Sequence, residues 1–196
     1  GSESDEMDFH RMVLYLGYDF SDWIKFHSET ELEHAWTDDG YVLLEQAYVD
    51  FLLSDRANIR TGRMLAPVGI INQHHEPTLF NGVERPNFSK YIIPTTWSTD
   101  GIGLFGHLNP AWSYEAYVVA GLDGDSFSSS GIRSGRMQSR QSLNEVAFTG
   151  RLDYRPFEEA LASVNQSLRF GVSGFYGGLD NVNGGGGNGK DGEIAL

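Results

Sequence analysis

Three consecutive residues of this 196-residue chain could bind a metal ion. His74, His75 and Glu76 could together offer two imidazole nitrogens and a carboxylate to zinc. Neighbouring residues rarely converge on one ion without further ligands from elsewhere in the fold. We therefore predict no bound metal and no cofactor.

Two glycine-rich segments, 123–126 and 181–192, combine acids or amides with small residues. Neither contains the spaced carboxylates and closing glutamate of a calcium loop, and we predict external loops, with 178–192 as the glycine-rich one. The sequence also lacks a nucleophile elbow and a phosphate-cradling glycine loop that leads into a helix. These motifs would be expected of many enzymes, and we predict that the protein is not an enzyme.

Charged side chains recur at every second position, opposite apolar ones. In the segment 24–33, Ile24, Phe26 and Leu32 share one parity, and charged or histidine side chains occupy the other. Such alternation is typical of a β-strand with one wet face. If the wet faces line a water-filled lumen, an acidic column on one wall and arginines opposite it would screen ions by sign. The predicted pore-lining residues are Lys25, His27, Glu29, Glu31, Glu33, Asp50, Arg60, Arg63, Glu115, Glu145, Arg151, Asp153, Arg155 and Arg169.

A period of two dominates the rest of the chain, and helical spacing is missing. No run of about 18 apolar residues is present, but a membrane-spanning strand needs only about 9 to 11 residues. Turn signals lie near 21–22, 37–40, 54–57, 109–112 and 156–164, and far longer connections at about 72–99, 123–143 and 178–192. Every odd connection is thus fairly short, and every even one after the second is long. This alternation favours a barrel over the solvated face of an ordinary antiparallel sheet, which is the alternative interpretation.

The fold class predicted from these patterns is all-β, an antiparallel transmembrane β-barrel. The chain holds about nine meander strands in a single domain over 1–196, and Ile194–Leu196 begins a further apolar stretch. Nine strands leave no obvious closing strand, so we expect this chain to be part of a larger barrel.

The amino-acid composition limits the classes of molecule that the protein is expected to bind. The formal net charge is -13, and only three of the fourteen basic residues are lysines. Nucleic acid is therefore not an expected partner, because phosphate binding requires a basic surface. Cations are better suited as small partners, and the absence of cysteine excludes disulfides and thiolate chemistry.

One part of the chain resembles a known family. The segments 44–51, 58–63 and 67–69, and the long connection through Phe80–Pro86 to Tyr91–Trp97, are similar to the phosphate-selective porins of the O and P type. The resemblance implies a channel of the bacterial outer membrane, commonly a homotrimer, with sixteen or more strands in the whole barrel. It also implies that residues 72–98 form a constriction loop, whose charged and histidine residues are His74, His75, Glu76, Glu84, Arg85 and Lys90.

The wet faces depart from the family pattern in one respect. Phosphate selectivity in the family relies on lysine and arginine ladders, whereas many wet positions here are acidic. We therefore predict passive diffusion of small hydrophilic solutes or ions, with outer-membrane lipid around the barrel, and do not expect phosphate selectivity.

Two other functions fit the same residues. The first is a plugged or adhesive outer-membrane barrel that binds a partner through its external loops. The second is a soluble carbohydrate-active β-protein that uses Trp36, Trp97 and Trp112 as sugar platforms.

Overall fold

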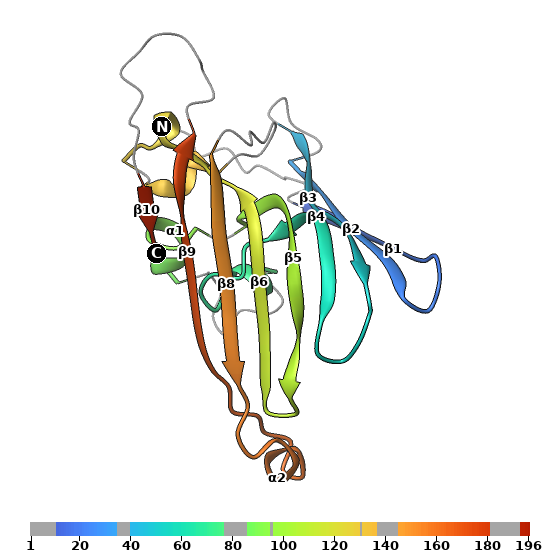
Figure 1. Cartoon of the computed structure of the whole chain (residues 1–196). Helices are drawn as coiled ribbons and strands as arrows, with labels where there is room; N and C mark the ends of the chain where they lie inside the picture. Colours follow the sequence, from blue (N-terminus) through green and yellow to red (C-terminus); the bar gives the residue numbers. More distant parts are fainter. Residues whose placement is uncertain are drawn as a thin grey trace, which may run out of the picture.

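The computed structural model describes residues 11–34, 40–76, 86–94, 96–129, 131–136, 145–180 and 193–196. Its main feature is one large antiparallel sheet (Figure 1). Among the described residues, no helix is long and apolar enough to span a membrane.

The strands follow one another along the sheet as a meander, in the order β1-β2-β3-β4-β5-β6-β8-β9-β10. The two-residue strand β7 stands off this path and pairs with β9 in parallel. An all-β antiparallel fold is therefore confirmed, and the sheet of the described residues is open. The strands are β1 (Arg11–Asp19), β2 (Ile24–Glu33), β3 (Tyr41–Phe51), β4 (Asn58–Leu65), β5 (Ser98–Asn109), β6 (Trp112–Ala120), β7 (Leu122–Asp123), β8 (Val146–Tyr154), β9 (Phe170–Asp180) and β10 (Glu193–Ala195).

Connections of different length join the strands. The turns after β1, β3 and β5 lie at the lower end of the sheet, and so does the longer connection 155–169, which holds the short helix α2 (Glu158–Ala162) (Figure 1). The long connection after β4 begins at residue 66, six residues earlier than predicted, because β4 ends at Leu65. It contains the short helices η1 (Asn72–His74) and α1 (Phe88–Tyr91).

The sheet has one apolar face. Leu14, Leu16 and Phe148 expose 47%, 55% and 56% of their surface, although each is a large hydrophobic residue. The strand register places Leu104, Val118, Phe148 and Tyr176 on this same face. We call it the outer face, and the face of opposite parity the inner face.

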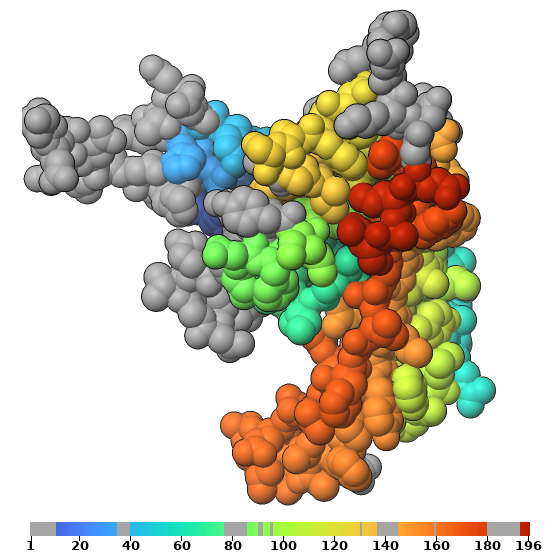
Figure 2. Space-filling view, turned by 90° about the vertical axis from the view of Figure 1, so that its left-hand side faces the viewer, coloured from blue at the N-terminus to red at the C-terminus, as the bar shows by residue number. Residues whose placement is uncertain are grey.

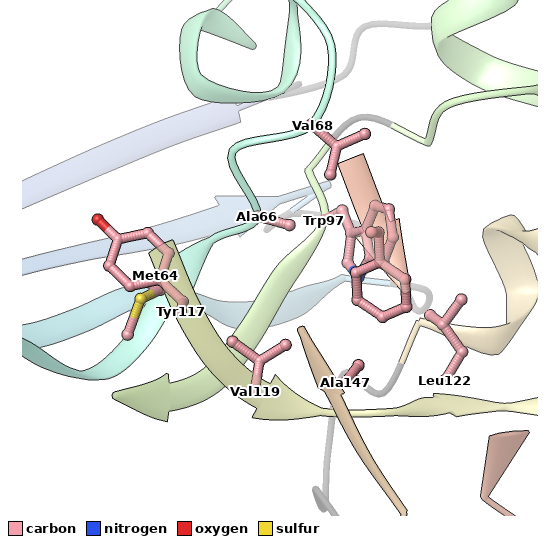
Figure 3. Close-up of a cluster of buried hydrophobic side chains, with 9 residues drawn as sticks. Met64, Ala66, Val68, Trp97, Tyr117, Val119, Leu122 and Ala147 are labelled. Atoms are coloured by element: carbon pink, nitrogen blue, oxygen red, sulfur yellow. The ribbon is translucent and has the colours of Figure 1, made fainter. Parts of the chain in front are cut away.

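The inner face carries the core of the described residues. Trp97 and Phe175 are each 2% exposed, and their rings lie 4.7 Å apart. Figure 3 shows Ala66 and Val68, from the connection after β4, on the same side of the sheet as Val119 and Ala147. This apolar cluster fastens the start of the long connection to the sheet. Phe127 and Ile132 of the connection between β7 and β8, which holds η3 (Gly124–Ser126) and η4 (Ile132–Gly135), pack against it.

Candidate pore constriction

The first part of the connection after β4, residues 66–76, crosses the inner face of the sheet; we call it the crossing segment. The Gly69 amide donates to Ser173 Oγ of β9 at 2.9 Å. The Gly69 carbonyl accepts a hydrogen bond from the Arg151 guanidinium of β8. In Figure 2 the described parts of this connection, teal and green, lie between the blue N-terminal strands and the orange and red C-terminal strands. The crossing segment therefore reaches from β4 to the far side of the described sheet.

Asn72 ties the crossing segment to the beginning of β5. Its Nδ2 donates to the carbonyls of Ala66 and Trp97 at 2.7 and 3.0 Å. Its Oδ1 accepts from the Trp97 amide at 2.8 Å. Asn72 is 1% exposed, so these bonds satisfy a buried amide side chain and hold the two ends of the connection together.

Gln73 and Glu115 form a second polar attachment, on β6. Gln73 Nε2 lies 2.9 Å from each carboxylate oxygen of Glu115. Glu115 also accepts from the Tyr117 hydroxyl at 2.9 Å. A cavity of about 470 Å³ lies beside this attachment. Its lining contains the predicted site residues Arg60, His74, Glu115, Asp153, Arg155 and Arg169.

A β-bulge turns Glu45 toward the crossing segment. In the pairing of β2 with β3, Glu29 lies opposite Gln46 and Thr30 opposite Leu44, so Glu45 is the extra residue. A bulge can redirect a side chain that regular alternation would place on the other face. Glu45 Oε2 lies 2.9 Å from His75 Nε2, and both residues are buried, with 1% and 3% of their surface exposed.

Four side chains converge at this bulge, and we call them the acidic cluster. Glu29, Glu45, His75 and Glu76 each place one potential ligand atom within 4.8 Å of the others. Burial opposes the charge of His75, but the hydrogen bond to Glu45 and nearby carboxylates outweigh it and raise the pKa of His75. Burial and the neighbouring Glu29 carboxyl raise the pKa of Glu76, although His75 acts in the opposite direction. The protonation of each of these groups therefore depends on the charge of its neighbours.

Further carboxylates lie beside the acidic cluster. Arg11 of β1 forms ion pairs with Glu31 and Glu33 of β2. Glu33 also accepts a hydrogen bond from the Tyr41 hydroxyl. Negative charge is thus concentrated on the inner face of β2 and β3, next to the crossing segment.

An arginine on β4 occupies the wall between these carboxylates and β5. Arg60 donates two hydrogen bonds to Asp50, at 2.7 and 2.8 Å. Its guanidinium lies 4.1 Å from the ring centre of Tyr48 and 4.9 Å from that of Phe105. These aromatic contacts hold the cation on the wall.

A second arginine group lies on β8 and in the connection that joins β8 to β9. Arg151 Nε donates to Asp153 Oδ2 at 2.8 Å, and both residues are buried. Arg169 Nε lies 3.9 Å from Asp153 Oδ1. Arg155 donates to the Ser113 hydroxyl at 3.0 Å. Arg60 of β4, Arg151 of β8, and Arg155 and Arg169 of the connection between β8 and β9 are therefore separated across the sheet from the acidic column on β2.

The remaining predicted residues have different positions. Lys25 pairs with Asp19 at 2.6 Å, and the His27 ring lies 5.2 Å from Tyr48. Arg63 shares the outer-face parity of Ile102 in the register and pairs with Asp100 at 3.2 Å. Glu145 is exposed just before β8. Trp36, Glu84, Arg85 and the side chain of Lys90 lie outside the described residues.

Several residues of the constriction were missed by the sequence analysis. Glu45 has the parity of outer-face residues, and its only sequence signal is a carboxylate among Val42, Leu44 and Ala47. Arg11, Asn72 and Gln73 were not predicted as part of the constriction, because a strand pattern does not show which side chains of separate elements meet in the fold. Trp97 is buried, so it is not available as a sugar platform.

The chain has relatives in sequence. It matches the family described as phosphate-selective porin O and P over residues 1–194 and therefore belongs to that family of outer-membrane β-barrel porins. It is also 37% identical over 189 residues to an uncharacterized protein of Aquifex aeolicus (strain VF5). That match covers 92% of this chain and 41% of the relative, so the chain spans about two fifths of the relative's length. Family membership points to a channel rather than an enzyme.

Proposed function

We propose that the whole protein is a bacterial outer-membrane porin that lets small hydrophilic solutes or ions diffuse through a water-filled lumen. One observation carries this proposal. The crossing segment runs over the charged inner face and contacts β3, β6, β8 and β9, through His75, Gln73 and Gly69. A loop attached to the inner wall at several points narrows the pore but leaves it open.

The outer face supports a position in the membrane. Large apolar side chains are exposed there on strands whose backbone groups are paired with neighbouring strands, which is what lipid requires of a spanning sheet. We propose outer-membrane lipid as the partner of this face and a homotrimer as the assembly. A barrel of sixteen or more strands would be completed by the rest of the protein.

The distribution of charge suggests an ion preference. Glu29, Glu31, Glu33, Glu45 and Glu76 gather where the crossing segment meets β2 and β3, with Arg11 and His75 as the nearby cationic or ionisable groups among the described residues. Cations would be concentrated at this point, and the arginines of β4, of β8 and of the connection after β8 would set a field across the lumen. We therefore propose cation preference, with residues 72–98 setting the size limit.

Conductance tests this function directly. The full-length protein, purified in detergent, would be inserted into planar bilayers under a salt gradient. We expect discrete conductance steps and a reversal potential of the sign that indicates cation preference. Glu115→Ala removes the acceptor for Gln73 and is expected to enlarge the steps. A reversal potential of opposite sign would refute cation preference, and a silent membrane with confirmed insertion would refute the channel.

A plugged barrel is the second candidate, and the paired charges favour it. Arg60 with Asp50, and Arg151 with Asp153, are already neutralised within the wall, and Arg151 also bonds to the crossing segment. A lumen filled by such contacts would bind partners through its external loops and would not conduct. The bilayer experiment separates the two candidates.

A further inference from the structure

The acidic cluster has the composition and geometry of a metal site. We propose that Glu29, Glu45, His75 and Glu76 bind a divalent first-row transition-metal ion, for which Zn²⁺ is the suitable probe. This proposal goes beyond the channel function and does not depend on it, because ion binding is measured without a membrane.

The four residues come from three elements that meet only in the fold. Glu29 belongs to β2, Glu45 is the bulged residue of β3, and His75 and Glu76 end the crossing segment. Their potential ligand atoms all lie within 4.8 Å of one another. Four residues with one candidate ligand atom each match the number of ligands that zinc takes in structural sites.

Unpartnered buried oxygens show that the cluster is incomplete by itself. Glu29 is 2% exposed and Glu45 is 1% exposed, yet the Oε1 atom of each has no hydrogen-bond partner. Oε1 of Glu76 has none either, and its ion-pair contact is with His75 Nε2 at 3.6 Å. Leaving a buried carboxylate oxygen unpaired is costly, and three such groups close together also repel one another. A bound dication would satisfy the free oxygens and balance the negative charge.

The second nitrogen of His75 supports the same assignment. His75 Nδ1 lies 3.1 Å from the carbonyl of Asn72, which can only accept, so the proton belongs on Nδ1. Without a metal, Nε2 donates to the Glu45 carboxylate, 2.9 Å away, and a bound ion would take the place of that proton between the two groups. Metal-binding histidines are commonly oriented in this way, by donating the distal N–H to a backbone carbonyl.

The donor set selects the class of metal. One imidazole nitrogen with carboxylate oxygens suits zinc and its transition-metal neighbours, whereas magnesium and calcium prefer oxygen ligands alone. An ion bound here would connect β2 and β3 to the end of the crossing segment. It would thereby fasten the crossing segment to the wall opposite its attachments on β8 and β9.

Calorimetric titration of the full-length protein in detergent, after removal of metals with EDTA, tests the site. We expect one Zn²⁺ per chain, and an affinity reduced at least about tenfold by Glu45→Gln and by His75→Gln. Glu158→Gln is the matched control, because it makes the same change at an exposed residue of α2, outside the acidic cluster and the crossing segment. It is expected to leave the Zn²⁺ affinity unchanged.

Competition by other dications and the spectrum of bound Co²⁺ test the class of metal and its coordination. Mg²⁺ or Ca²⁺ at the same concentration is expected not to compete, and competition would overturn the assignment to a transition metal. If a variant fails to fold, the visible spectrum of Co²⁺ added to the unaltered protein replaces it, and an intense band of a four- or five-coordinate ion is expected. The site would be refuted if the unaltered protein bound no Zn²⁺, or if Glu45→Gln and His75→Gln bound Zn²⁺ as tightly as the unaltered protein. The weak spectrum of hydrated Co²⁺ would also refute it. Each of these results would leave the channel proposal intact.

Discussion

The crossing segment is attached to the inner face at two ends by opposite chemistry. At its beginning, Ala66 and Val68 pack with Trp97 and Phe175, and Asn72 satisfies the nearby backbone groups. At its end, His75 and Glu76 meet buried carboxylates whose oxygens are partly unpaired.

The apolar end holds the crossing segment in place, whereas the acidic end supplies the groups for binding an ion. The apolar end excludes water and completes its hydrogen bonds, so it stabilises the crossing segment in the same way as an ordinary core. The acidic end gathers like charges that the described protein groups do not balance, which costs stability and leaves room for a cation. Local frustration of this kind is expected where a protein binds something.

The largest effect is expected from Trp97→Ala, which empties the centre of the apolar end. Removing a buried aromatic side chain of this size costs about 3–5 kcal/mol, because the lost contacts leave a cavity. The free energy of unfolding in detergent, measured with denaturant, checks this. Phe157→Ala is the control, since Phe157 is 74% exposed, and a change within about 0.5 kcal/mol is expected. Equal losses in both variants would show that the apolar end does not anchor the loop.

Binding of Zn²⁺ at the acidic end is expected to stabilise the folded protein. If Zn²⁺ binds only the folded protein, a free concentration 100 times the dissociation constant adds about 2.7 kcal/mol to the free energy of unfolding. Thermal or denaturant unfolding with and without Zn²⁺ measures the gain. With an affinity at least about tenfold weaker, Glu45→Gln should retain a gain of at most about 1.4 kcal/mol at the same Zn²⁺ concentration, and an undiminished gain in this variant would place the bound ion elsewhere.

Asn72→Ala is expected to cost about 2 kcal/mol. The substitution leaves the buried Trp97 amide without an acceptor, and an unsatisfied buried group carries a penalty of about 1–3 kcal/mol. Denaturant unfolding again measures the loss. Asn109→Ala is the comparison, because Asn109 accepts from Ala111 and Trp112 amides in an exposed turn, where water can replace it. Similar losses at both positions would argue against a special role of burial at Asn72.

The smallest effect is expected at Gly69, between the two attachments. Its φ of +71° favours glycine, and Gly69→Ala should cost about 1 kcal/mol from backbone strain. A matched change is Gly17→Ala, where the nearest atom to an added Cβ is 3.7 Å away and φ is not positive. Little change is expected there. If Gly69→Ala were equally neutral, the turn would not be needed to present the Gly69 carbonyl to Arg151.

The sequence by itself determined the strands and their two faces. Period-two patterning works because successive side chains of a strand point to opposite sides, whatever the strand pairs with. The segment 24–33 shows this, since its apolar and charged parities lie on the outer and inner faces as predicted. The short turns and the long connections were visible for the same local reason.

Only the tertiary structure decided how the constriction is assembled. Glu45 has outer-face parity in the sequence, and a bulge, which no alternation rule predicts, brings it to His75. The adjacent pair His75 and Glu76 lacked further ligands in the sequence, because Glu29 and Glu45 lie more than 25 residues earlier and meet them only after β2, β3 and the crossing segment pack together. Side-chain convergence from separate elements depends on packing, and packing is a property of the whole sheet.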